Sequence, residues 1–361
     1  MKTSLEVEYW VVDESGDLVS PGTLLDMSEQ IDPEFVEPMI ELKTTPCDSM
    51  TELQGEFLDL LERVITAARE QDKRLVPLAT PLSSSPADIP FREKRGTDLQ
   101  RQIVGPTFDD ARVCAGTHVH FEQSNVPDQL NTLTAIDPAF ALVNSASHYR
   151  GEPILGCARP YLYRRSCYSA CPEQGQLWSY VDSVDEWEQR LESAYESFRE
   201  RALEHGVDTA AFEDEFEPYG AVWTPVRLRK EVPTVEWRSP DTALPSQIFP
   251  LVESIGSLVS HADAHGTAID GEPTSDARSD EPLALPAFDT VESTVDAAIQ
   301  HGLEDSSVQQ YLRQLGFDPS SYTPLADQLP DKHLSDREAA ALRLEAADAL
   351  ESELSTRRVH A

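Results

Sequence analysis

Hydrophobic and polar residues alternate at the start of the chain, and this alternation predicts a strand over residues 3–12. Leu5 and Val7 fall on one side of that strand, with Tyr9 and Val11 after them, whereas Glu6 and Glu8 fall on the other side. Further extended segments are expected at residues 34–44, 75–80, 113–121 and 234–237.

Elsewhere the hydrophobic residues recur every three to four positions, which is the spacing of a helix with one buried face. Helices are predicted at residues 51–71, 182–206, 248–264, 288–302 and 335–355. Ser335 and Glu338 form a capping box that marks the start of the last one. A proline is tolerated only in the first turn of a helix, so Pro250 places the start of the third helix close to residue 248.

Strands and helices are mixed along the chain without strict β-α-β alternation. This order predicts an α+β fold, with an antiparallel or mixed sheet and helices packed on one side of it. We expect one large domain over 1–265, a polar and proline-punctuated linker or loop over 266–287, and a helical C-terminal part over 288–361 that packs on the large domain.

The charge balance excludes several classes of partner. The 361 residues include 65 acidic and 29 basic ones, so the net charge is −36. Such a surface repels nucleic-acid phosphates and anionic lipids, and we expect neither nucleic acid nor membrane as a partner. Lysine is scarce, with 6 Lys against 23 Arg. Acid excess with little lysine indicates a protein of a halophile's cytoplasm, where a Debye length of about 3 Å at molar salt screens the repulsion; the alternative is an ordinary acidic protein.

The N-terminal residues and the cysteines both indicate the cytoplasm. Residues 1–10 are charged and resemble no signal peptide, and no segment approaches the ~20 apolar residues of a membrane span. The five cysteines are irregularly spaced, and Cys167 and Cys171 lack a second pair at zinc-finger distance. We therefore expect a soluble cytoplasmic protein with reduced thiols; its oligomeric state, including a homo-oligomer, stays open.

Three predicted strands share one polar pattern. Each places two ionisable side chains around one apolar residue, in the triplets Glu6-Val7-Glu8, His118-Val119-His120 and Glu236-Trp237-Arg238. Side chains at i and i+2 of a strand point to the same face, roughly 6.5–7 Å apart. If the strands are neighbours, one sheet face collects three carboxylates, two imidazoles and a guanidinium. Glu41 could add a carboxylate, and either Glu34 or Glu37 a further one.

Such a face predicts a divalent metal site. Crowded carboxylates raise one another's pKa, and burying them without compensation is costly. An oxygen-rich set with an imidazole suits Mg²⁺, or Mn²⁺, better than zinc, and Mg²⁺ bound in this way commonly meets nucleotide phosphates. Each pair alone also has a structural explanation, as a solvated acidic face, ordinary strand histidines or a local ion pair. The chain has no P-loop, no Rossmann glycine pattern and no Gly-x-Ser-x-Gly elbow.

Four segments together carry a resemblance to a known family. They are Leu-Glu-Val-Glu-Tyr at 5–9, Ile-Glu-Leu-Lys-Thr-Thr-Pro at 40–46, Gly-Thr-His-Val-His-Phe at 116–121 and Thr-Val-Glu-Trp-Arg-Ser-Pro-Asp-Thr at 234–242. In this order and spacing the sequence, over residues 1 to about 260, resembles the carboxylate-amine ligases. More narrowly, it resembles the type 2 glutamate–cysteine ligases, which are relatives of glutamine synthetase.

The resemblance implies a catalytic core with a six-stranded antiparallel sheet curved into a funnel, which holds ATP at one end and amino acids at the other. It implies metal ligands at Glu6, Glu8, Glu34, Glu41, His118 and Glu236, with Glu37 as the competitor of Glu34. His120 and Arg238 would act in catalysis, facing the phosphate of ATP, and Arg159, Arg164 and Arg165 would bind substrate carboxylates.

Two departures from the family pattern concern the substrate side. The family's Pro-Arg-Thr-Gly stretch reads Pro-Glu-Gln-Gly at 172–175, and residues 286–300 contain no Lys or Arg where a basic segment is expected.

The implied activity is that of an ATP- and Mg²⁺-dependent glutamate–cysteine ligase. It would form γ-glutamylcysteine from glutamate and cysteine through an acyl phosphate, as a thiol buffer or a glutathione precursor. Three alternatives stay open: the same chemistry with another amine or carboxylate, a metal-dependent hydrolase in which His118 and His120 hold zinc, and a non-catalytic cation-binding protein.

Overall fold

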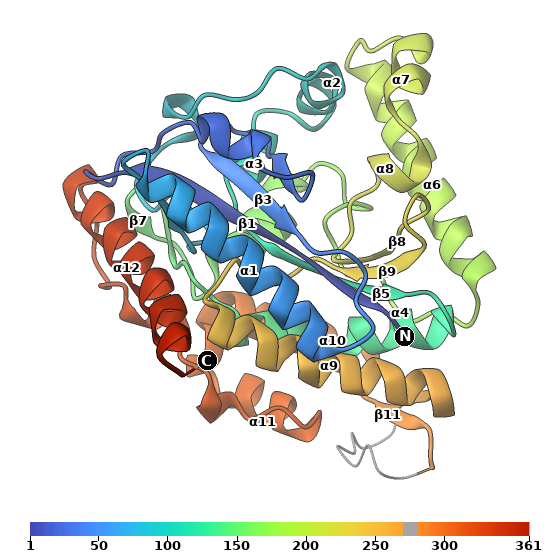
Figure 1. Ribbon diagram of the computed structural model, residues 1–361. Helices are drawn as coiled ribbons and strands as arrows, with labels where there is room; N and C mark the ends of the chain where they lie inside the picture. The colour runs from blue at the N-terminus through green and yellow to red at the C-terminus, as the bar shows by residue number, and fades with distance from the viewer. Residues whose placement is uncertain (270–279, 361) are drawn as a thin grey trace.

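A computed structural model describes residues 1–269 and 280–360 of the chain (Figure 1). One antiparallel sheet organises it. Its strands run in the order β2 (Ile31–Pro33), β3 (Met39–Lys43), β1 (Thr3–Asp13), β5 (Thr117–Glu122), β9 (Thr234–Trp237) and β8 (Val226–Leu228), and β4 (Lys73–Val76) pairs with the end of β1. The predicted antiparallel sheet with helices is thereby confirmed, with seven strands among the described residues where the resemblance implied six.

One face of the sheet is hydrophobic and covered by helices. Leu5, Val7, Tyr9 and Val11 of β1 share a buried cluster with residues of α1 (Met50–Arg69) and α9 (Pro245–His265). These two helices cross the front of the sheet side by side (Figure 1). The strand alternation therefore leaves the glutamates of β1 on the opposite face.

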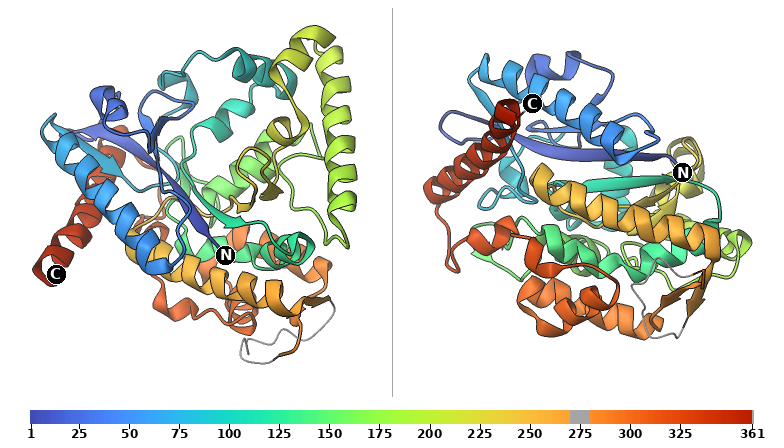
Figure 2. Two further views of the ribbon diagram at one scale, coloured as in Figure 1. Left: turned by 45° about the vertical axis from the view of Figure 1, so that its right-hand side comes forward. Right: turned by 60° about the horizontal axis from the view of Figure 1, so that its bottom comes forward.

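The C-terminal helices belong to the same core. The cluster that contains the β1 side chains also includes Val295, Leu312 and Leu350. These residues lie on the last three helices, α10 (Phe288–His301), α11 (Ser306–Gln314) and α12 (Asp336–His360). The C-terminal part thus packs directly against the sheet's helices (Figure 2).

A helical arm flanks the polar face of the sheet. It comprises α2 (Arg95–Val104), α3 (Phe108–Arg112), α6 (Val184–Glu204), α7 (Thr209–Glu215) and α8 (Pro218–Ala221). Phe108, Phe198 and Phe212 join these helices in a cluster of their own. In Figure 2 the arm stands beside the sheet, on the side away from α12.

The remaining elements are short. They are the strands β6 (His148–Tyr149), β7 (Glu152–Pro153), β10 (Thr267–Ile269) and β11 (Leu283–Leu285), the helices α4 (Val126–Ala135) and α5 (Ala158–Tyr161), the π-helix η4 (Leu162–Cys167), and the 3₁₀ turns η1 (Gly22–Asp26), η2 (Pro86–Asp88), η3 (Asp137–Val143), η5 (Gly302–Glu304), η6 (Pro319–Ser321) and η7 (Leu325–Gln328). In the part of the chain that the structure describes, no helix is long and apolar enough to cross a membrane.

The structure also tests the predicted element boundaries. The last helix begins with the expected reciprocal cap, in which the Ser335 N–H donates to Glu338 Oε2 at 2.9 Å and the Glu338 N–H to Ser335 Oγ at 3.4 Å. The predicted start of the third helix, at residue 248, was wrong, because α9 begins at Pro245 and Pro250 lies within it. Pro245 occupies the first turn, where a proline needs no hydrogen-bond partner.

The segment 266–287 is not wholly irregular. Its two ends form β10 and β11, which pair in parallel, and residues 270–279 of the predicted loop lie outside the described residues. Leu283 and Leu285 are buried on either side of Ala284. This short alternation is the signal that the sequence interpretation missed.

Candidate active site

The register of the sheet brings the predicted polar pairs together. Glu6 of β1 stands opposite His118 of β5, and His120 stands opposite Glu236 of β9. On the other side of β1, Glu8 stands opposite Glu41 of β3. The prediction that these strands are neighbours with one shared polar face is therefore confirmed.

The side chains of this face lie close enough together for several of them to bind the same metal ion. Glu6 Oε2 is 3.2 Å from both His118 Nδ1 and His120 Nε2, and His118 Nε2 is 3.8 Å from Glu8 Oε1. Three groups of residues could each hold a metal ion, because the donor atoms within each group lie within 4.8 Å of one another. The groups are Glu6, His120 and Glu236; Glu6, Glu41 and His118; and Glu8, Glu34 and Glu41. Glu34, rather than Glu37, joins the cluster and lines the cleft above it.

Burial and repulsion shift the pKa values of this cluster in opposite directions. Burial, followed by the charges of neighbouring carboxylates, raises the pKa of Glu34 and of Glu41 well above the usual range. Burial also raises the pKa of the Glu6 carboxyl, but the hydrogen bonds with His118 and His120 outweigh it and hold that pKa low. For His118 itself, burial and then the charge of Arg238 lower the pKa to about 3, so its ring is neutral and able to act as a ligand.

The donor set fits a divalent metal. The Nε2 atom of His118 is buried and has no hydrogen-bond partner. Unpaired buried nitrogens beside crowded carboxylates are costly unless a cation joins them. Glutamate oxygens with few nitrogens suit Mg²⁺ or Mn²⁺ better than zinc.

Glu236 lies between two arginines. It is fully buried, accepts a hydrogen bond from Arg227 Nε at 2.6 Å, and is paired with Arg238 on its other oxygen. Burial raises the pKa of Glu236, but the charges of Arg227 and Arg238 outweigh it and hold that pKa well below its usual range. Arg227 and its neighbour Arg229 were not identified from the sequence. They show the same i, i+2 spacing as the other pairs, on the short strand β8 and just after it.

The four glutamates Glu6, Glu8, Glu34 and Glu41 line the floor of a cleft that also contains many basic side chains. The cleft contains about 1150 Å³ of space, part of it open to solvent. Its lining includes six of the 29 basic residues of the chain, namely Lys43, Lys94, Arg227, Arg229, Lys230 and Arg238. Asp32, Glu217 and Glu231 line the cleft as well. In so acidic a protein, this concentration of cations beside carboxylates favours a polyanion that is held through metal ions.

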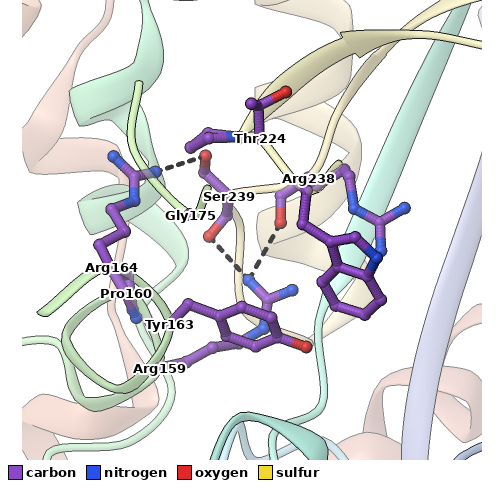
Figure 3. A pocket seen from close by; sticks show the side chains of 10 residues that line it. Arg159, Pro160, Tyr163, Arg164, Gly175, Thr224, Arg238 and Ser239 are labelled. Carbon is purple, nitrogen blue, oxygen red and sulfur yellow. Dashed lines mark hydrogen bonds between the residues drawn. The ribbon is translucent and has the colours of Figure 1, made fainter. Parts of the chain in front are cut away.

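A second, smaller pocket adjoins the cleft (Figure 3). It contains about 410 Å³ of space and shares Tyr163, Trp223 and Arg238 with the larger cleft. The rings of Tyr163 and Trp223 stack with centroids 5.9 Å apart, and the Arg238 guanidinium lies 5.3 Å from the Trp223 ring centroid. These three side chains form a shared wall between the two compartments.

Two of the three expected substrate arginines line this pocket. Arg159 and Arg164 line it, but the Arg164 guanidinium is buried and donates to both oxygens of Asp137, at 2.6 and 3.2 Å, and to Ser239 Oγ at 2.7 Å. Arg165 pairs with Asp296 of α10 and with Gln176 instead, and lines neither compartment. Internal carboxylates and amides thus already pair with the Arg164 and Arg165 side chains, and their substrate roles stay predictions.

Arg164 is accordingly expected to stabilise the fold. Asp137 is fully buried and also accepts a hydrogen bond from Trp237 Nε1 at 2.8 Å. Replacing Asp137 with alanine leaves the buried guanidinium without its partner, so Asp137→Ala should lower the free energy of unfolding by about 3–5 kcal/mol. Denaturant unfolding measures this; Glu196→Ala, which breaks the exposed pair with Arg199 on α6, is the control. Equal stability of Asp137→Ala and wild type would contradict the assignment.

Comparisons with known proteins show what this chain is similar to. The model of the family described as "Glutamate-cysteine ligase family 2 (GCS2)" matches residues 5–310. A Rhodospirillum rubrum protein named "Putative glutamate–cysteine ligase 2" is 29% identical over 222 residues, which are 58% of this chain. The match covers 50% of that relative, so it spans about half of the relative's length.

Two solved structures share the fold. One is a glutamate–cysteine ligase from Francisella tularensis in complex with AMP, with a TM-score of 0.64 and 15% identity over 98% of this chain and 89% of the other. The second is a bifunctional glutathione synthetase from Pasteurella multocida, with a TM-score of 0.54 and 16% identity over 97% of this chain and 52% of the other.

Proposed function

Because the chain belongs to glutamate–cysteine ligase family 2, we propose that it is an ATP-dependent ligase that joins L-glutamate to L-cysteine as γ-glutamylcysteine. The observation that carries the proposal is the cross-strand cluster of glutamates and histidines that faces a basic wall in one cleft. A carboxylate floor and a cationic wall together suit a nucleotide triphosphate with its metal ions.

The reaction places specific demands on these residues. A carboxylate is a poor acyl donor, so the γ-carboxylate of glutamate first takes the terminal phosphoryl group of ATP, and the amine of cysteine then displaces phosphate from the acyl phosphate. Mg²⁺ or Mn²⁺ would be held by the carboxylates and one imidazole of the sheet face, namely Glu6, Glu8, Glu34, Glu41, His118 and Glu236. Such ions would supply positive charge that offsets the charge of the phosphates.

The cationic residues complete the site. Arg238 and His120 would stabilise the charge of the phosphoryl group during transfer, and Arg227, Arg229 and Lys230 line the same cleft and would hold the rest of the triphosphate. The smaller pocket adjoins Arg238 and would receive an amino-acid substrate. The two compartments meet at the position where the phosphoryl group would be transferred.

The test is a phosphate-release assay with ATP, Mg²⁺, glutamate and cysteine in high salt. Release that requires both amino acids, together with γ-glutamylcysteine in the product, supports the proposal. Release with glutamate and a different amine indicates the same chemistry with another acceptor. Hydrolysis of a substrate without ATP indicates the metal-dependent hydrolase. Among the described residues, the candidate metal-binding groups contain only two histidines, His118 and His120, which would be the zinc ligands of such an enzyme.

We further propose that the protein works at high salt, in the cytoplasm of a halophile. With a net charge of −36, repulsion among surface carboxylates opposes the compact state when few cations are present. Folding and activity should therefore increase up to molar KCl, where the Debye length falls to about 3 Å. Circular dichroism over a salt series measures this, and a protein that is fully folded and active at ~50 mM salt would remove the proposal.

A further inference from the structure

Arg159 holds the backbone at the end of β9. The residue is 5% exposed, and its Nη1 atom donates to three consecutive carbonyl oxygens, those of Arg238, Ser239 and Pro240, at 3.0, 3.1 and 3.2 Å. Figure 3 shows the guanidinium beneath two of these carbonyls. One nitrogen thus fixes the segment that carries Arg238.

The same guanidinium packs against the start of β5. A Cβ added to Gly116 would lie 2.2 Å from Arg159 Nη2 and 2.4 Å from its Cζ, and its three nearest atoms all belong to Arg159. Gly116 is not among the glycines with a positive φ, so the guanidinium, and not the backbone conformation, is what requires a glycine here. The Gly116 N–H in turn donates to Glu8 Oε2 at 2.6 Å.

Little of the Arg159 guanidinium is left for a substrate. Nη1 is already shared among three carbonyls, and Nε is buried without a partner. The Tyr163 ring centroid lies 5.1 Å from Cζ and covers one face. The remaining edge of the fork carries Nε and Nη2, and Gly116 packs against both of these atoms, which restricts the approach of a carboxylate to that edge.

We propose that Arg159 is a positioning residue that fixes Glu8 and Arg238 relative to each other across the ends of β5 and β9, rather than a receptor for a substrate carboxylate. The inference rests on the proposed function. Through Gly116 the guanidinium sets the place of a metal-ligand candidate, and through the three carbonyls it sets the place of the phosphate-facing arginine. A displacement of about 1 Å at such groups can cost on the order of 10²-fold in rate.

Arg159→Lys tests the proposal, because lysine keeps the charge but lacks the planar fork. We expect kcat to fall by at least ~10-fold and the half-saturating Mg²⁺ concentration to rise, with the KM values for glutamate and cysteine within about 3-fold of wild type. Calorimetric titration with Mg²⁺ alone should show the weaker binding without any turnover. Arg199→Lys, on the exposed face of α6, is the matched control. A KM for either amino acid that rises more than ~10-fold while Mg²⁺ binding stays unchanged would identify a substrate receptor and overturn the proposal.

Gly116→Ala provides an independent test through a double-mutant cycle. Alone, its methyl group displaces the guanidinium and should reproduce the loss seen in Arg159→Lys. In the Arg159→Ala background that clash is gone, so the alanine should cost much less than in wild type. Wild-type kinetics of Gly116→Ala, or equal losses in both backgrounds, would contradict the proposal. If wild type itself shows no ligase activity, the proposed function fails, and the Mg²⁺ titrations still decide the positioning of Glu8.

Discussion

Replacing Arg238 with lysine is expected to lower kcat by ~10²-fold or more while leaving the KM for ATP nearly unchanged. The side chain is 15% exposed, faces both compartments and lies against the Trp223 ring. Its planar fork can meet two phosphoryl oxygens, whereas the lysine ammonium is a single point of charge. Since the charge on the transferred group grows toward the transition state, the loss should appear in kcat.

The competing explanation treats Arg238 only as the partner of buried Glu236. In that case Arg238→Lys lowers stability, and turnover per folded molecule stays near wild type. Steady-state kinetics at saturating and limiting Mg²⁺, normalised to the folded fraction from circular dichroism, separates the two explanations. Arg199→Lys again serves as the control. Near-wild-type kcat in Arg238→Lys would return Arg238 to a structural role.

Replacing Glu41 with glutamine is expected to raise the half-saturating Mg²⁺ concentration by at least ~10-fold and to cut turnover strongly at limiting Mg²⁺. Glu41 belongs to two of the three candidate metal-binding groups, so its loss affects both. Glutamine keeps the size of the side chain and one carbonyl oxygen but removes the charge that binds the ion. His118→Ala should act in the same direction, because His118 donates to one of these groups. Wild-type activity of both variants at limiting Mg²⁺ would place the metal site elsewhere.

The same substitution should stabilise the metal-free protein at neutral pH. Burial and then the charges of Glu34, Glu6 and Glu8 raise the pKa of Glu41 well above 4.5. Its ionised form therefore costs folding free energy, and this cost appears as the pH rises through the raised pKa. Without divalent ions, Glu41→Gln should melt higher than wild type at pH 8 and equally at pH 4, and saturating Mg²⁺ should reverse the order. A lower melting temperature at pH 8 without metal would contradict the repulsion among these carboxylates.

The sequence was sufficient to predict the polar face of the sheet. In a strand the side chains alternate strictly, so Glu6 with Glu8, and His118 with His120, had to share a face once their strands were recognised. The opposite faces of β1, β5 and β9 carry mainly apolar residues, which fixed the orientation of the strands in the core. The order and spacing of the motifs along the chain gave the family resemblance. The strand register then confirmed that β1 pairs with β5 and that β5 pairs with β9.

The parts that escaped prediction depend on distant pairings. Arg164 was assigned to substrate from the family resemblance; its partner Asp137 lies 27 residues earlier, and sequence spacing does not reveal a buried ion pair. Arg227 was missed because β8 has only three residues, too few for a clear alternation. The role of Gly116 became visible only when the Arg159 guanidinium was found against it.

The shared wall of Tyr163, Trp223 and Arg238 has a thermodynamic consequence. Each of these side chains contacts both compartments, so a ligand that shifts the wall from one side changes the free energy of binding on the other. Linkage requires this coupling to be reciprocal: the factor by which nucleotide alters the affinity for an amino acid equals the factor by which that amino acid alters the affinity for nucleotide. The order in which the two ligands bind then leaves the total free energy of the ternary complex unchanged.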